Sequence, residues 1–169
     1  MANDIAPGGN RATLTLSNGQ IIYLDSSGKG EITNTGNIKI IKLDSRTITY
    51  SQQQPNASKE IAYNTLETPN GGQYRIQLSD GTNVWLNAAS SIRYPVSFTG
   101  TSRTVEITGE AYFEVAHNAK MPFMVKAGST IIHDIGTHVN INAYNNEPSM
   151  KITLLEGAIQ IERSDTKAK

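Results

Sequence analysis

The chain has 169 residues, with fifteen basic and fifteen acidic side chains and no cysteine. A length of this order suits one domain, or one domain with a small appendage, that buries a core without disulfides. The balanced charge excludes a bulk field that would attract nucleic acid or an anionic membrane, and the lack of cysteine excludes thiol chemistry. We expect neither a membrane span nor a signal peptide, because no apolar run reaches about 18 residues and no charged leader precedes one.

Short strands separated by turn dipeptides follow one another from the N-terminus. Asn18-Gly19 stands between alternating aliphatic residues, which predicts a hairpin with a tight primed turn. The pattern returns 62 residues later, without a gap, around Asp80-Gly81, where Trp85 takes the position of Tyr23. The likeness indicates either an internal structural repeat, in which the N-terminal segment repeats residues 69–87, or two hairpins that converged on one turn chemistry.

Two further strands are expected between these hairpins, at 38–43 and 46–50, with Asp44-Ser45 as the turn that joins them. Residues 51–59 are polar and show no periodicity, which is typical of a loop. This loop contains Asn56-Ala57-Ser58, which is either a glycosylation acceptor or a chance tripeptide.

The remainder of the chain predicts more strands of five to seven residues with glycine at the corners. Ser102-Arg103 predicts a turn, and a polar tail is expected at 164–169. Strands are expected at 105–107, 110–115, 121–125, 131–135 and 139–143, followed by a last hairpin over 152–161. Glycines at 109, 128, 136 and 157 separate these strands. We therefore predict an all-β fold: an antiparallel β-sandwich, a jelly roll, or a short β-solenoid built of hairpins with glycine corners.

Two of the three histidines, together with a neighbouring aspartate, are candidates for a metal site. His133 and His138, with Asp134, would supply the ligands. An odd spacing along a strand sends the two imidazoles to opposite faces, unless Gly136 resets the phase. The alternative is that these are partly exposed strand histidines.

Glu110 and Glu114 are candidates for an acid–base pair. They share one face of a strand but lie about 13 Å apart at the rise of an extended chain, which exceeds the separation that glycosidases use. A structural role for Glu110 at the Gly109 corner is the alternative. No nucleophile elbow, phosphate-binding glycine loop or zinc spacing is present. We therefore expect no enzyme, no bound metal and no cofactor.

Exposed aromatic side chains would support a carbohydrate-binding module, because sugars stack on flat rings held by rigid strands. The same side chains are equally suited to a core between two sheets. The basic residues form no stripe with interleaved aromatics, which argues against nucleic-acid binding. The candidate aromatic residues are Trp85, Tyr94, Tyr112 and Tyr144.

Several segments, in this order, resemble the periplasmic domain of FecR-type anti-sigma factors in the form found in Bacteroidetes. They are DGTNVWLNAASSIRYPVSF, VEITGEAYFEVAH, PFMVKAG, GTHVNINAY and TLLEGAIQI. The resemblance covers roughly residues 66 to 162, and DIAPGGNRATLTLSNGQ extends it more weakly to the N-terminus. It divides the chain into a hairpin segment at 1–65, a FecR-like β domain at 66–163 and the tail at 164–169.

The resemblance assigns a structural role to the residues of these motifs. They are Asp80, Gly81, Trp85, Leu86, Asn87, Tyr94, Pro95, Gly109, Glu110, Tyr112, Phe113, Val115, Pro122, Phe123, Gly136, Thr137, Tyr144, Glu156 and Gly157.

The resemblance also implies a function. In that family the periplasmic part contacts the signalling domain of an outer-membrane TonB-dependent transducer. A cytoplasmic region, joined through one transmembrane helix, holds an extracytoplasmic-function sigma factor. We expect this chain to be the periplasmic part, and to reach the sigma factor and the membrane only through segments that it does not contain. The contact would add a strand to an exposed sheet edge, at the terminal strands or in the segment 37–50. A carbohydrate-binding β-sandwich module or an assembly-forming β-domain are the alternatives.

Overall fold

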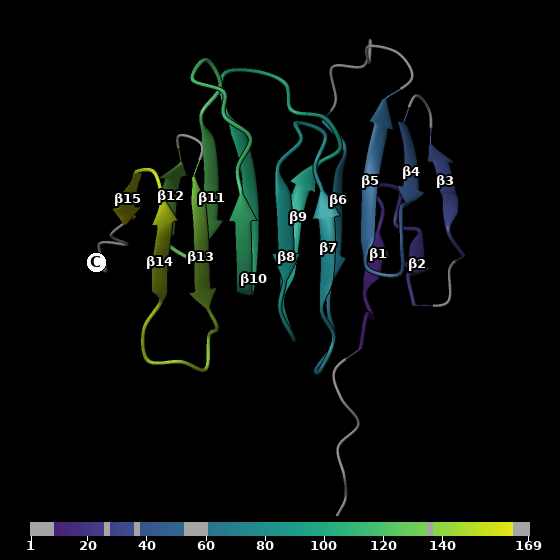
Figure 1. Ribbon diagram of the computed structural model, residues 1–169, viewed down its shortest axis with the longest axis horizontal. Coiled ribbons are helices and arrows are strands. Elements are labelled where there is room, and N and C mark those ends of the chain that lie inside the picture. Colours follow the sequence, from purple (N-terminus) through teal and green to yellow (C-terminus); the bar gives the residue numbers. More distant parts are fainter. Residues whose placement is uncertain (1–8, 26–27, 36–37, 53–60, 135–136, 164–169) are drawn as a thin grey trace, which may run out of the picture.

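The computed structural model of the chain describes residues 9–25, 28–35, 38–52, 61–134 and 137–163 (Figure 1). Every regular element within these ranges is a β-strand, so they hold no helix able to span a membrane. The all-β prediction is therefore confirmed. The sequon at 56–58, Gly136 and the tail at 164–169 lie outside the described residues.

The strands are β1 (Thr13–Thr15), β2 (Ile21–Tyr23), β3 (Gly30–Thr35), β4 (Ile38–Lys42), β5 (Thr47–Gln52), β6 (Tyr63–Glu67), β7 (Tyr74–Gln77), β8 (Asn83–Leu86), β9 (Ser91–Pro95), β10 (Arg103–Glu114), β11 (Phe123–Ala127), β12 (Thr130–Asp134), β13 (His138–Ala143), β14 (Lys151–Glu156) and β15 (Ile159–Arg163).

The strands form one mixed sheet that curls strongly into a half-barrel, so that two walls face each other (Figure 1). The front wall has the order β3-β4-β5-β7-β8-β10-β13-β14. The back wall has the order β2-β1-β6-β9-β10-β11-β12-β15. Strand β10 belongs to both walls and joins them.

Gly109 is the point at which β10 passes from the back wall to the front wall. Residues before it pair with β9 and β11, whereas residues from it onward pair with β8 and β13. Gly109 has a φ of 74°, and a Cβ atom on it would lie 2.4 Å from Ser90 Oγ. A side chain at this corner would therefore be strained by both the backbone conformation and the contact. The glycine corner expected here is real, although the strand is continuous through it.

The sheet is mixed rather than antiparallel throughout, which corrects part of the predicted fold. Two strand pairs are parallel, β5 with β7 and β10 with β11. The second half of β10 lies in the front wall, and the chain then crosses back to the back wall. There β11 runs parallel to the first half of β10. Corners between the walls, more than hairpins within a wall, produce this arrangement.

Two predicted turns are wrong, for different reasons. The expected last hairpin does not form, because β14 pairs with β13 in the front wall whereas β15 pairs with β12 in the back wall. Local turn signals do not report that a chain changes walls. The expected turn at Ser102-Arg103 is replaced by the start of β10, which lies in the back wall beside β9, and Arg103 is only 1% exposed.

The two hairpins that resemble each other in sequence are also built alike. β1 pairs with β2 and β7 with β8, both antiparallel. Gly19 N–H donates to the Leu16 carbonyl in one turn, and Gly81 N–H donates to the Leu78 carbonyl in the other. The predicted primed turns are wrong, because Asn18 and Asp80 do not have positive φ; only the glycine that closes each turn does, with 83° and 89°, as in a three-residue hairpin loop. The hairpins lie in opposite walls, and a parallel bridge between Gly9 and Gly72 links the segments that precede their first strands.

The core lies between the walls and follows the alternation of the strands. On β7, β8 and β10 every second side chain is buried, so each strand turns one row of aliphatic or aromatic groups inward. Burying one such side chain contributes about 1.5–3 kcal/mol. The largest buried side chains include Phe113, Phe123, Tyr94, Leu14, Leu66 and Leu86.

Candidate functional site

A buried ion pair stabilises the top of the half-barrel, where the β7–β8 turn meets the start of β10. Arg103 Nη1 lies 2.5 Å from Asp80 Oδ2, and the two side chains are 2% and 11% exposed. The guanidinium also donates to the carbonyl oxygens of Met121 and Ala116 at 2.7 and 2.8 Å. Thr82 Oγ1 donates to Asp80 Oδ2 at 2.7 Å. Asp80, which the motif singled out as a turn residue, is therefore the counter-charge of a buried cation, whose Nη2 has no hydrogen-bond partner among the described residues.

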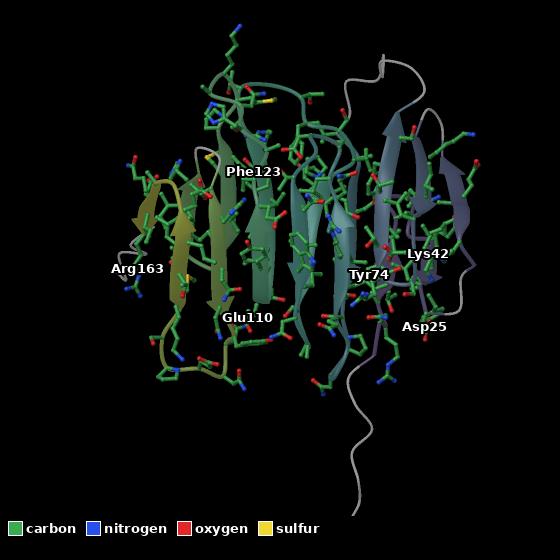
Figure 2. All side chains as sticks on the ribbon, in the orientation of Figure 1. Asp25, Lys42, Tyr74, Glu110, Phe123 and Arg163 are labelled. Atoms are coloured by element: carbon green, nitrogen blue, oxygen red, sulfur yellow. The ribbon has the colours of Figure 1, made fainter. Side chains whose placement is uncertain are left out.

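A second polar cluster stabilises the bottom corner. Glu110 accepts hydrogen bonds from Asn87 Nδ2 at 2.7 Å and from Asn140 Nδ2 at 2.8 Å. Its backbone N–H donates to Ser90 Oγ at 2.8 Å, and Tyr144 Oη donates to the Ala88 carbonyl. Figure 2 shows Glu110 at the lower end of β10. Both carboxylate oxygens already accept bonds from amides, an arrangement that suits positioning more than proton transfer.

The four candidate aromatic residues do not form a platform for stacking a sugar. Trp85 and Tyr112 are cross-strand neighbours with centroids 5.4 Å apart, but their planes are tilted by 51°. The Arg75 guanidinium lies 4.6 Å from the centroid of the Trp85 ring. Tyr94 is buried and bonded to Tyr50, and Tyr144 is bonded to the β8–β9 corner. Two coplanar exposed rings across a groove are therefore not present among these four.

The candidate metal ligands are not brought together as a set. His133 lies on β12 in the back wall and His138 on β13 in the front wall. Each faces a glutamate, Glu162 at 3.2 Å and Glu156 at 3.6 Å. The described ranges contain no group of three histidine, aspartate or glutamate side chains that could hold a metal ion, and the Asp134 side chain is outside them.

The other motif residues divide between core and corners. Gly81 has a φ of 89° in the turn between β7 and β8. Gly157 has a φ of 93° between β14 and β15, where the chain passes from the front wall to the back wall. Pro122 precedes β11, and its carbonyl accepts the Arg103 N–H. Val115 N–H donates to the Thr137 carbonyl. The buried members of the motif set are Leu86, Tyr94, Pro95, Gly109, Phe113, Val115, Phe123 and Thr137.

The sequence interpretation missed Arg103 and Ser90. Arg103 falls in the turn predicted at Ser102-Arg103, and no local pattern marks an arginine whose partner lies 23 residues away. Ser90 is 2% exposed and accepts the Glu110 N–H. Its position directly after a residue with positive φ, Ala89, is a conformational signal that appears only in the structure.

One end of the half-barrel is open and apolar. There β14 pairs with β13 along one edge, and β15 pairs with β12 along one edge. The other edge of each of these two strands has no partner strand among the described residues. Leu155 is 63% exposed, Leu154 39% and Ile161 54%. A cavity of about 600 Å³ lies between the walls at this end, and Met150, Ile152 and Arg163 are among its lining residues. We call this region the open end.

At the opposite end, β2 and β3 are the outermost strands. β2 has three residues, and on β3 Glu31 pairs with Lys39 at 3.1 Å. Short edge strands and charged side chains on an edge resist the addition of another strand. The segment 37–50, named as a candidate edge, is not one, because β4 and β5 are paired on both sides.

The fold and these clusters define an all-β domain whose polar networks stabilise corners and whose unpartnered surface lies at strand edges. A family model described as FecR protein matches residues 64–160, which is more than half of the sequence, so the chain belongs to the FecR family.

Two crystal structures of a candidate anti-sigma factor from Parabacteroides distasonis are similar to this chain. Both share 30% sequence identity with it, with TM-scores of 0.60 and 0.58. The matches cover 62% and 60% of this chain but 49% and 48% of the solved chains. The chain therefore spans about half the length of the solved structures it matches. No curated protein matches it.

Proposed function

We propose that this chain is the periplasmic signalling part of a FecR-like transmembrane anti-sigma regulator, and that it acts by protein–protein contact without catalysis. Its partner would be the signalling domain of an outer-membrane TonB-dependent transducer. The signal would reach an extracytoplasmic-function sigma factor through cytoplasmic and membrane-spanning segments of the whole regulator. Membership of the FecR family and the likeness to a candidate anti-sigma factor support this proposal.

The contact surface that we propose is the free edge of β14 at the open end. A free edge supplies main-chain donors and acceptors that pair with an added strand, and neighbouring apolar pockets supply specificity. Of the outermost strands, β14 combines six residues with two exposed leucines, Leu154 and Leu155. It also lies within the residues that match the family model, whereas β2 and β3 precede them. The exposed leucine pair on this edge is the observation that carries the proposal.

We predict that Leu155→Asp weakens capture of the transducer signalling domain by at least about tenfold, because a charge would have to be desolvated in the new sheet. The matched control is Ile21→Asp on β2, a side chain of similar exposure at the opposite end, 54% against 63%. The measurement is a pull-down with the purified signalling domain of a TonB-dependent transducer from the same organism, with circular dichroism to verify the fold. Wild-type binding by Leu155→Asp would refute the β14 contact. If the wild-type chain captures nothing, the transducer partnership itself is wrong.

A further inference from the structure

Two hollows lie side by side at the base of the front wall. The first, of about 220 Å³, lies where the β4–β5 turn meets the starts of β5 and β7. The second, of about 190 Å³, lies over β8, β10 and β13. They share Gln73, Trp85 and Leu86 as lining residues. We call the pair of hollows the front groove. Asp44, Tyr74 and Arg75 line its first half, and Glu110 lines its second half. Figure 2 shows Tyr74 and Glu110 in the lower part of the molecule.

Two donors in the first hollow have no hydrogen-bond partner among the described residues. They are the phenolic Oη of Tyr74 and the Nε of Arg75. Tyr74 is only 2% exposed. The Arg75 guanidinium is held in place, because its Nη2 donates to Asn83 Oδ1 at 3.0 Å and its plane lies against Trp85. Leaving a buried donor without an acceptor is costly, so this hollow is prepared for a group that accepts hydrogen bonds.

The groove also presents acceptors. The Asp44 carboxylate accepts the Arg46 N–H at 2.7 Å, and this bond lowers the Asp44 pKa, so the group remains ionised at neutral pH. At the other end the Glu110 carboxylate is oriented by two amides. A carboxylate has about four lone-pair positions, so both groups can accept further bonds. A ligand that fits must therefore donate as well as accept.

The charges around the groove favour an uncharged ligand. Burial raises the pKa of Tyr74, and the negative charges of Asp44 and Asp25 raise it further. The same negative potential opposes an anion at the phenolic oxygen, whereas Arg46 and Arg75 oppose a cation. A peptide backbone finds no strand edge here, because β5, β7, β8 and β10 are all paired with their neighbours. Only side chains are available to read a ligand.

We propose that the front groove binds an uncharged saccharide, whose hydroxyl groups accept from Tyr74 and Arg75 and donate to Asp44 and Glu110. Ring hydroxyls both donate and accept, and the apolar carbons of the sugar would rest against the edges of Trp85 and Tyr112. Recognition here relies on hydrogen bonds and not on stacking between parallel rings. The site is separate from the β14 edge, so it adds a ligand to a domain proposed above to act by protein contact.

Trp85 is the only tryptophan and lines both hollows, so its fluorescence reports directly on the groove. The experiment titrates the full chain with maltohexaose, xylohexaose and chitohexaose, and with hexaglycine and sodium acetate as peptide and anion controls. We expect a saturable change in emission with at least one oligosaccharide and none with the controls. A response to none of the three oligosaccharides, or a saturable response to hexaglycine or acetate, would overturn the proposal.

Tyr74→Phe provides the sharper test, because the hydroxyl that it removes has no partner among the described residues. We expect the oligosaccharide Kd to rise about threefold to tenfold, the loss of one neutral hydrogen bond, while the melting temperature stays within about 1 °C. The matched control is Tyr94→Phe, whose hydroxyl is bonded to Tyr50 away from the groove. It should lower the melting temperature and leave saccharide binding unchanged. Equal Kd values for wild type and Tyr74→Phe would refute the site, whereas loss of transducer capture by Leu155→Asp bears only on the β14 contact.

Discussion

At the scale of single residues, Asp80 and Arg103 show how a local turn becomes part of the tertiary structure. Asp80 Oδ1 accepts the Thr82 N–H at 3.0 Å, as an aspartate in a tight turn commonly does. Its other oxygen accepts from a guanidinium that is almost fully buried. Removing one member of a buried pair leaves an unpaired charge, which costs more than the pair itself contributes.

We predict that Asp80→Ala lowers the free energy of unfolding by about 3–5 kcal/mol, because Arg103 would lose its counter-charge inside the protein. The control is Glu31→Ala, which breaks the more exposed pair with Lys39 and should cost less than about 1 kcal/mol. Urea unfolding followed by circular dichroism measures both. Equal losses for the two variants would show that Arg103 finds another acceptor or reaches water.

At the scale of the element, β10 determines the topology. Its first half is the partner of β9 and β11 and its second half the partner of β8 and β13, so β10 is the only strand of the described sheet that belongs to both walls. The corner requires a residue with positive φ and no side chain, because Ser90 Oγ and the Ala89 carbonyl approach closely.

We predict that Gly109→Ala destabilises the protein by about 2–5 kcal/mol, the sum of backbone strain and overpacking. Gly128→Ala is the matched control: its φ is also positive, 58°, but no atom lies within 4 Å of the added Cβ. It should cost only about 1–2 kcal/mol, from the backbone alone. Thermal unfolding of the two variants separates the terms, and a Gly109→Ala variant as stable as Gly128→Ala would mean that Ser90 moves aside freely.

At the scale of the whole molecule, hydrogen bonds tie the front wall to the back wall through the core. Tyr50 on β5 lies 2.6 Å from Tyr94 on β9, oxygen to oxygen, and Asn64 on β6 donates to the Tyr50 hydroxyl at 2.9 Å. Burial raises the pKa of Tyr50 to about 12 and raises the pKa of Tyr94 well above its ordinary value. Burial therefore favours the protonated form of both phenols in the folded chain.

We predict that the free energy of unfolding falls as the pH rises from about 10 to 12. In this window the unfolded chain releases phenolic protons that the folded chain retains, so the unfolded state binds fewer protons and stability decreases with pH. Each such tyrosine contributes a slope of about 1.4 kcal/mol per pH unit. Urea unfolding between pH 9 and 11.5 measures this slope, and Tyr50→Phe should reduce it. A slope unchanged by Tyr50→Phe would exclude a contribution from this contact.

The sequence alone was enough to predict the all-β class, most strand positions, the places of the turns at Asn18-Gly19 and Asp80-Gly81, and the FecR resemblance that the family match confirmed. These properties are local: period-two alternation sets which side chains face inward, and glycine permits positive φ. The division into 1–65 and 66–163, and the structural roles assigned to the motif residues as a set, stay predictions.

The sequence could not predict the mixed curled sheet, the separation of β14 from β15, or the burial of Arg103, all of which come from tertiary packing. Each depends on which wall a strand enters after a corner, and that choice is made by contacts between residues far apart in sequence. An Asp–Gly turn is recorded in four neighbouring residues, whereas the partner of a buried arginine, or the unpaired donors of Tyr74 and Arg75, exist only once distant strands have packed together.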